Sequence, residues 1–227
     1  METAAICPWD HFSSATIHFC ENQLCSYIVK PAETWSNIGY VLVGIYILYL
    51  CKKENNPHLR VLGLVGICLG FMSATFHATG TFFGEFLDVS SMYLLTATGI
   101  SFNSRRLFQL SFTKARALFI LILSLSMGLL LLFRPIGITL FGIQFVTAVI
   151  LEVILFFKSK ERAAYRYFLY MVVTFLTAWC VWWLDLLKIW CNPDNHLFNG
   201  HAFWHLETAL IFYFIYRFFC QFKQLRS

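Results

Sequence analysis

Two pairs of residues spaced four positions apart are the strongest candidates for chemistry in this sequence: His201 with His205, and Ser73 with His77. On a helix, residues i and i+4 lie on the same face. His201 and His205 would therefore direct two imidazoles at one point, and Ser73 would place a hydroxyl beside the imidazole of His77. Together with the carboxylate of Asp88, these are side chains that bind metal ions and transfer protons.

The composition predicts that membrane-spanning helices carry these residues. Of 227 residues, 59% are hydrophobic and only 13% are charged, and the mean hydropathy is +0.65. A soluble domain carries about 25% charged residues. The composition therefore excludes a soluble globule, a disordered chain and a small disulfide scaffold. The formal net charge is +5, but the sequence has no basic stripe with interleaved aromatics, so we expect no nucleic-acid partner.

A bilayer core needs about 20 mostly apolar residues per helix, and on this basis the chain divides into seven spans. Their expected ranges are 36–50, 61–78, 82–101, 115–133, 136–157, 167–190 and 198–219. Residues 1–30 lack the basic start and compact apolar run of a secretory signal, so we treat them as part of the mature protein. The predicted fold class is an all-α membrane protein, a seven-transmembrane helix bundle. We expect it to form a single seven-transmembrane domain over residues 1–227, with 1–33 as an outer N-terminal segment.

The orientation follows from the distribution of Lys and Arg, since positive loops stay in the cytoplasm. Lys30, Arg134 and Lys188 fall on one side of the predicted topology, and 14 of the 17 basic residues fall on the other. These 14 are Lys52, Lys53, Arg60, Arg105, Arg106, Lys114, Arg116, Lys158, Lys160, Arg162, Arg166, Arg217, Lys223 and Arg226. We therefore predict an N-terminus that is outside or lumenal and a cytoplasmic C-terminus.

This topology brings the candidate residues to one depth in the membrane. His77 lies near the outer end of an outward-running span, and Asp88, His201 and His205 lie in the outer third of inward-running spans. Ionisable groups inside spans are costly and usually functional. Three neutral imidazoles predict a three-histidine zinc site with a fourth position open for water, the catalytic pattern.

Each of these residues also has a structural alternative. A single histidine near a span end is more often an interfacial residue than a ligand. Asp88 could be a buried acid paired with a backbone or hydroxyl group, and Ser73 could be a small helix-packing residue. Asp185, in the sixth span, could support a zinc-bound imidazole, or it could pair with Lys188 or another helix.

The order and spacing of three motifs resemble the alkaline ceramidases. These motifs are Ser73-x-x-x-His77, Asp88-x-x-x-Met92 and His201-x-x-x-His205. The alkaline ceramidases belong to a superfamily of seven-span hydrolases that includes the adiponectin receptors and the Per1-type GPI-lipid-remodelling proteins. The runs Cys20-Glu21, Ser36-Asn37 and Trp183-x-Asp185, the last followed by Cys191, also look like ceramidase features. The run from Pro31 to Asn37 fits a bacterial or Per1-like branch equally well.

The resemblance implies that His77, His201 and His205 bind zinc and that Asp88 and Ser73 complete the active site. The implied function is zinc-dependent, intramembrane hydrolysis of the N-acyl bond of ceramide-like lipids. The protein would then be a multi-pass protein of the cell membrane if bacterial, or of the ER or Golgi if eukaryotic. Its partner would be a membrane lipid, and protein partners stay open. The alternatives are ester hydrolysis of a phospholipid or GPI lipid, and a receptor or scaffold with structural zinc.

Animal ceramidases of this type carry an acidic calcium-binding segment before the first span. Here the matching run is 18–23, His-Phe-Cys-Glu-Asn-Gln, and Lys30 stands where another acid would be expected. Glu21, Asn22 and Glu33 remain, but they are too few for a cation that takes six to eight oxygens. We therefore do not expect bound calcium.

Cysteine positions divide into two groups. Four at cytoplasmic ends or inside spans are expected to stay reduced: Cys51, Cys68, Cys180 and Cys220. Four fall on the outer side, where disulfides are permitted: Cys7, Cys20, Cys25 and Cys191. Because the resemblance places Cys20 and Cys191 near the site, we predict a disulfide between them.

Overall fold

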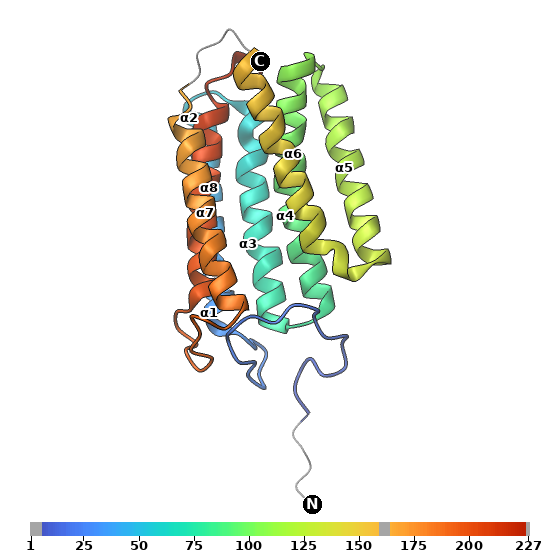
Figure 1. The fold of residues 1–227 in the computed structure, drawn as a ribbon, viewed down its shortest axis with the longest axis vertical. Helices are drawn as coiled ribbons and strands as arrows, with labels where there is room; N and C mark the ends of the chain where they lie inside the picture. The colour runs from blue at the N-terminus through green and yellow to red at the C-terminus, as the bar shows by residue number, and fades with distance from the viewer. Residues whose placement is uncertain (1–5, 159–163, 226–227) are drawn as a thin grey trace, which may run out of the picture.

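The computed structural model describes residues 6–158 and 164–225, and within these ranges the chain is a bundle of long α-helices (Figure 1). The long helices are α2 (Ile38–Lys53), α3 (Arg60–Thr79), α4 (Phe82–Phe108), α5 (Phe112–Leu132), α6 (Gly137–Lys158), α7 (Arg166–Leu186) and α8 (Gly200–Phe219). The short α1 (Pro31–Trp35) leads into α2, and 3₁₀ turns lie at Pro57–Leu59, Arg134–Ile136 and Lys223–Leu225. Each long helix coincides with one predicted span.

Two helix ends differ from the sequence prediction by four residues or more. Helix α4 continues past Ser101 to Phe108, because Gln109 takes the left-handed conformation that ends it. Helix α7 stops at Leu186 rather than Trp190, because Lys188 has a φ of 57° and the chain turns there into a loop.

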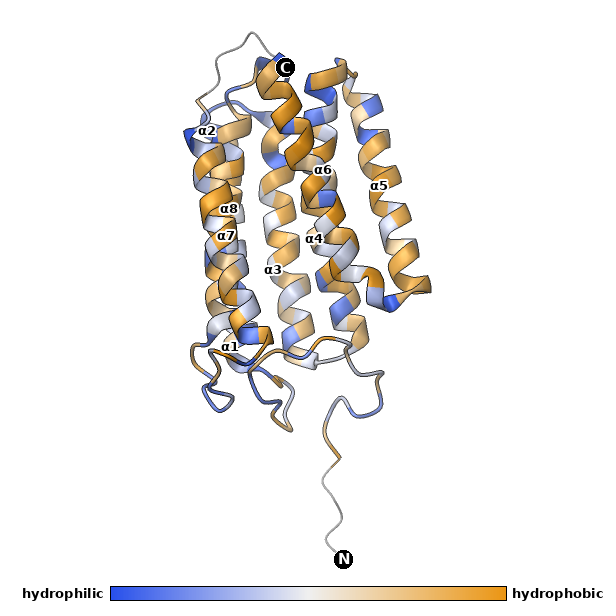
Figure 2. Cartoon of the chain, viewed as in Figure 1, coloured by the Kyte–Doolittle hydropathy of each residue, from blue (hydrophilic) through white to orange (hydrophobic). Residues whose placement is uncertain are grey.

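Five stretches of the described chain are long and apolar enough to cross a membrane. They are Pro31–Lys53, Pro57–Thr79, Phe112–Leu132, Arg134–Lys158 and Arg166–Leu186. The apolar residues run along most of the length of the helices in Figure 2. Helices α4 and α8 are not among these five stretches of the described chain, because polar side chains interrupt their apolar sequences. These two helices carry most of the predicted site.

The bundle is organised around α3, α4 and α8. Helix α3 packs between α2 and α4, helix α8 packs against α2 and α7, and α5 and α6 pack against α4. The approach of α4 to α3 requires glycine at position 84, because a Cβ there would lie 2.6 Å from the Cα of Phe76. Asp88 is one turn further along α4, so this contact brings the carboxylate toward α3.

Both ends of the bundle are built from segments far apart in the sequence (Figure 1). We call the end with residues 6–30, the turn between α3 and α4, and the loop between α7 and α8 the site end. Lys30, Arg134 and Lys188 lie there, as predicted. At the opposite end lie Lys52, Lys53, Arg60, Arg105, Arg106, Lys114, Arg116, Lys158, Arg166, Arg217 and Lys223. Lys160, Arg162 and Arg226 lie outside the described residues.

The N-terminal segment crosses the site end and is held there by hydrogen bonds and a disulfide. Backbone hydrogen bonds join Ser13 to Phe82 at 2.8 Å and Ala15 to Gly80 at 3.2 Å. The predicted Cys20–Cys191 disulfide is confirmed. A second disulfide joins two further cysteines that the prediction left unassigned on the same side, Cys7 and Cys25. The remaining cysteines are thiols, as predicted: Cys51, Cys68, Cys180 and Cys220.

Candidate metal centre

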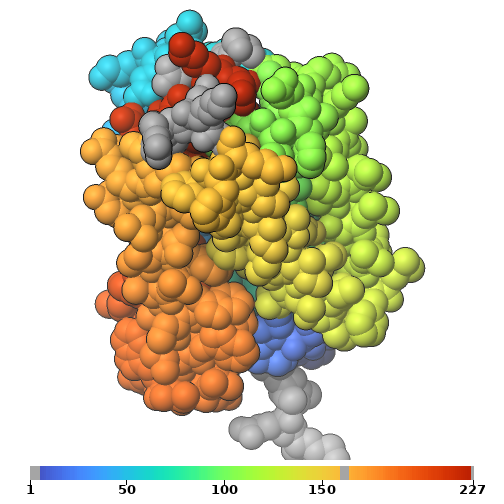
Figure 3. All heavy atoms as spheres, turned by 45° about the horizontal axis from the view of Figure 1, so that its top comes forward, coloured from blue at the N-terminus to red at the C-terminus, as the bar shows by residue number. Residues whose placement is uncertain are grey.

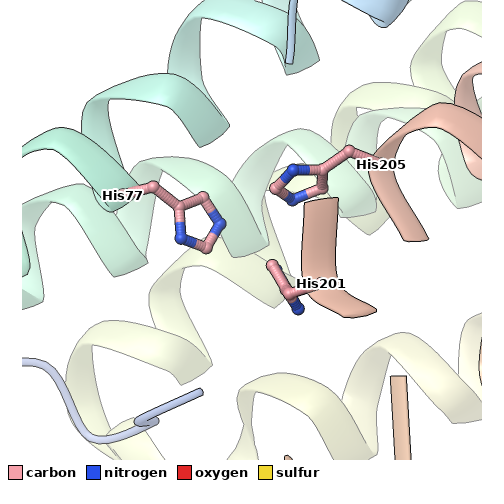
Figure 4. Close-up of side chains that lie close together, drawn as sticks. All are labelled: His77, His201 and His205. Carbon is pink, nitrogen blue, oxygen red and sulfur yellow. The ribbon is translucent and has the colours of Figure 1, made fainter. Parts of the chain in front are cut away.

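Three buried histidines meet near the site end of the bundle. His77 comes from the last turn of α3, and His201 and His205 come from the first two turns of α8 (Figure 4). Their possible ligand atoms all lie within 4.8 Å of one another, and the side chains are at most 3% exposed. The structure thus brings together the three imidazoles that the sequence singled out, from positions more than 120 residues apart.

The start of α8 is fixed by two polar side chains. The Asn199 side chain caps the helix by accepting a hydrogen bond of 2.8 Å from the backbone N–H of Ala202. Asp185 accepts hydrogen bonds from the backbone N–H of His201 at 3.0 Å and of Cys20 at 2.9 Å. Asp185 therefore holds the backbone beside His201, which agrees with the suggestion that it pairs with another helix and corrects the suggestions that it supports an imidazole or pairs with Lys188.

Short helix α1 supplies partners for two of the three imidazoles. Nδ1 of His77 lies 2.8 Å from Oε2 of Glu33, and Nδ1 of His205 lies 2.8 Å from the hydroxyl of Ser36. The Ser36 hydroxyl in turn donates to the Glu33 carbonyl at 3.1 Å. Metal-binding histidines typically donate their second N–H to such partners, which fixes the ring and leaves the other nitrogen for the ion.

The sequence prediction gave Glu33 and Ser36 no role in holding imidazoles. From the sequence, Glu33 is considered only as a possible calcium ligand, and Ser36 only as part of a run that looks like a ceramidase feature. The available signal was a carboxylate and a hydroxyl one helical turn apart at the outer end of the first span.

The buried ring nitrogens test whether these residues fit a metal ion. Nε2 of His77 and Nδ1 of His201 are buried and have no hydrogen-bond partner among the described residues. Buried polar atoms are nearly always bonded, so such orphans need an explanation. Three neutral imidazoles with free ring nitrogens are the donor set of a transition-metal ion such as zinc. The residues present fit such an ion.

The two residues predicted to be catalytic lie at the same cavity. Asp88 and Ser73 line it together with His201 and His205. The Ser73 hydroxyl lies close to the Asp88 carboxylate. An acid, a hydroxyl and a cluster of metal-binding nitrogens therefore face one space, where they can move protons and stabilise negative charge.

This cavity extends from the histidines toward the opposite end of the bundle. Its walls are apolar and come mainly from α4, α6, α7 and α8, with Phe141, Phe175 and Phe212 among the lining residues. Asn103 and Glu152 line its far end. Asp88 and Asn103 are separated by about 22 Å of α4, at 1.5 Å per residue. The cavity is therefore long and apolar, which suits a hydrocarbon chain.

A buried ion pair lies at the far end of the cavity. The Arg106 guanidinium binds the Glu152 carboxylate, with one contact of 3.2 Å. The Tyr165 hydroxyl donates to the same carboxylate at 2.8 Å. Neither charged side chain is more than 7% exposed. The end of the cavity opposite the histidines is therefore polar, whereas its walls are apolar.

Comparison with known proteins places the chain in one family. The family model described as Ceramidase matches residues 11–226. The chain belongs to the ceramidase family. It is 21% identical to alkaline ceramidase 1 of Homo sapiens over 211 residues, covering 88% of this chain and 80% of the human protein. It is 22% identical to alkaline ceramidase of Drosophila melanogaster over 231 residues, covering 94% of this chain and 80% of that relative. Residues 11–30, the loop between α7 and α8 and helices α1 to α8 fall inside the matched range.

In this ceramidase-family chain, the N-terminal acids weighed for calcium have other partners. Glu21 accepts hydrogen bonds from the backbone N–H groups of Ala32 and Glu33, at 3.1 and 3.0 Å. Its carboxylate also contacts His196 at 2.8 Å and Asn199 at 3.3 Å. Glu21 therefore caps the N-terminus of α1 and ties it to the loop before α8.

Proposed function

We propose that this protein is a zinc-dependent intramembrane amidase that hydrolyses the N-acyl bond of ceramide-like lipids to a sphingoid base and a fatty acid. The observation that carries the proposal is the meeting of three buried histidines with Asp88 and Ser73 at the head of a long apolar cavity. Membership of the ceramidase family supports the choice of substrate, since the relatives are named alkaline ceramidases.

The proposed setting is a membrane crossed seven times by α2 to α8, as one domain. The apolar stretches support this arrangement, and so does the collection of basic residues at the end opposite the site. With that end in the cytoplasm, the site end and its two disulfides face the outside or a lumen, where disulfides form. The membrane itself is a cell membrane in a bacterium, and an ER or Golgi membrane in a eukaryote.

His77, His201 and His205 are the proposed zinc ligands. Zinc bound there would polarise a carbonyl oxygen and bring the pKa of a bound water to about 7. Glu33 and Ser36 hold the rings of His77 and His205 through Nδ1, so that Nε2 of each is free to bind the ion.

Asp88 is the proposed proton carrier and Ser73 its partner. The Asp88 carboxylate would accept a proton from the attacking water and then deliver it to the nitrogen of the leaving sphingoid base. The Ser73 hydroxyl is in contact with Asp88 in this structure. In the reaction it would donate a hydrogen bond to the negative charge that develops on the carbonyl oxygen.

The cavity accounts for how a lipid is held. One hydrocarbon chain of the substrate would run along the apolar walls toward Asn103 and Glu152, while the amide stays beside Asp88. Helix α6 packs on α4 and α7 packs on α8, with the cavity lined by all four. Figure 3 shows the face on which α6 and α7 lie next to each other. We propose that the lipid reaches the cavity sideways, from the bilayer.

The deciding experiment combines metal analysis with a lipid panel. The protein is purified in detergent, its metal content is measured, and ceramide, an ester phospholipid and a GPI lipid are offered side by side. We expect one zinc per chain and release of fatty acid from ceramide that stops when a chelator removes the metal. Release from the esters alone would instead support the lipid esterase, and zinc without hydrolysis of any lipid would support the receptor or scaffold.

A further inference from the structure

Lys30 is a buried lysine whose ammonium group lies close to the metal centre. Its side chain is 6% exposed. Nζ lies 3.2 Å from Oε2 and 3.5 Å from Oε1 of Glu33. Burying an ammonium group is costly unless it is paired. Oε2 of Glu33 is also the atom that contacts Nδ1 of His77, so a single carboxylate joins the lysine to a candidate metal ligand.

The same ammonium group faces an aromatic ring. Nζ of Lys30 lies 5.5 Å from the centre of the Phe19 ring, within the range of a cation–π interaction. That ring stacks on the imidazole of His201, with 3.7 Å between centroids and 27° between planes. Phe19 is held in place through its neighbour Cys20, which is bonded to Cys191.

His201 differs from the other two histidines in how it is held. His77 and His205 each have an Nδ1 contact that sets the ring orientation. The His201 ring has no such contact: no described residue is hydrogen-bonded to it, and its unpartnered Nδ1 is a nitrogen free for a metal ion. The contact that fixes the plane of this ring is therefore the stack with Phe19.

We propose that Lys30 is a positioning residue for the metal centre. Its ammonium group holds the Glu33 carboxylate against His77 and the Phe19 ring against His201, so that one cation orients two of the three imidazoles. The role rests on the proposed metal site. It makes the N-terminal segment part of the ligand scaffold rather than a cover over it.

Zinc affinity and the absorption spectrum of the cobalt-substituted protein test this role directly. Lys30→Met removes the ammonium group and keeps the apolar stem, and Phe19→Leu removes the ring and keeps an apolar side chain. Partners that orient metal ligands are typically worth about 10–100-fold in metal affinity. We expect each variant to bind zinc that much more weakly and to alter the cobalt spectrum, which reports ligand geometry.

Lys188→Met is the matched control, because Lys188 is an exposed lysine at the same end of the bundle. It should leave zinc affinity and the cobalt spectrum unchanged. Lys30→Met leaves the Glu33 carboxylate with one cation fewer, so the double variant Lys30→Met/Glu33→Gln, which buries no unpaired charge, is also measured and is compared with Glu33→Gln alone. Unchanged zinc affinity and an unchanged cobalt spectrum in the folded Lys30 variants would overturn the role of Lys30. Failure of the unsubstituted protein to bind zinc is a different result, and it would overturn the metal site itself.

Discussion

Oε2 of Glu33 lies 2.8 Å from Nδ1 of His77, although the two residues are 44 positions apart in the sequence. Both side chains are fully buried. The contact joins the short helix α1 to the last turn of α3. The contact occupies Nδ1 of His77. The nitrogen that remains for a metal ion shared with His201 and His205 is therefore Nε2.

Glu33→Gln should weaken metal binding without removing the site. The amide keeps the shape of the side chain but is a weaker acceptor for the His77 N–H, so zinc affinity should fall by about 10–100-fold. Competition with a chromophoric chelator measures the change. Glu207→Gln is the control, since Glu207 is on α8 but contacts Thr177. Equal zinc affinity in Glu33→Gln and the native protein would contradict the role of Glu33.

Substitutions of the three histidines and of Asp88 should affect metal binding and proton transfer differently. Replacing His77, His201 or His205 with Ala should remove zinc and hydrolysis together. Asp88→Asn is nearly isosteric, so zinc should stay while hydrolysis falls by about 10²–10⁴-fold, the range for a general acid–base group. Metal content and turnover are measured on the same samples. Loss of zinc from Asp88→Asn would make the aspartate a ligand, and full activity in His201→Ala would exclude the three-histidine site.

Ser73→Ala should have a smaller effect than loss of a histidine. Removing one hydrogen-bond donor to a developing oxyanion costs about 10²–10³-fold in turnover, and metal content should not change. Ser90→Ala is a suitable control, because Ser90 is a buried serine of α4 with no hydrogen-bond partner among the described residues. If Ser73→Ala hydrolyses ceramide at the native rate, the hydroxyl is a packing group.

Gly99→Leu should change the preference for chain length. Gly99 lines the cavity about 16 Å along α4 from Asp88, and an added Cβ would lie 3.6 Å from Ala148. A larger side chain there would block the deeper part of the cavity. Overpacking costs about 1–3 kcal/mol, so long-chain substrates should be hydrolysed about tenfold more slowly, and short-chain substrates at the native rate.

A series of substrates of increasing chain length measures this effect. Gly142→Leu is the control, because a Cβ at position 142 of α6 meets no atom within 4 Å. An equal loss on every chain length would show that the lipid chain does not run past Gly99.

Loss of the Cys20–Cys191 disulfide should loosen the N-terminal segment. The bond closes a loop of 171 residues, and such a bond typically stabilises a fold by about 2–4 kcal/mol. Cys191→Ala should therefore lower the thermal unfolding temperature and speed zinc release, because Phe19 beside Cys20 stacks on His201. Cys68→Ala, at an exposed thiol of α3, is the control. Unchanged zinc release in Cys191→Ala would mean that the segment is held by its hydrogen bonds alone.

The sequence by itself determined the helices and the candidate metal ligands. Long apolar runs can form only helices where backbone groups must be satisfied internally, and α2 to α8 follow the predicted ranges. The spacing of His201 and His205 places both rings on one helix face, whatever the helix packs against. The collection of basic residues at one end of the bundle could also be predicted, because it depends only on the order of helices and loops along the chain.

The tertiary structure decided what surrounds those ligands. Phe19 and Lys30 lie in a segment that has little regular structure before α1, and Glu33 and Ser36 lie in and directly after this five-residue helix, so no long periodicity predicts where their side chains go. Asp185 turned out to bind two backbone N–H groups, because the fold brings Cys20 and His201 to it. Side-chain contacts within one helix repeat with a known period, whereas contacts between distant segments depend on the packing of the whole bundle. For this reason the imidazoles could be predicted from the sequence, and the groups that orient them could not.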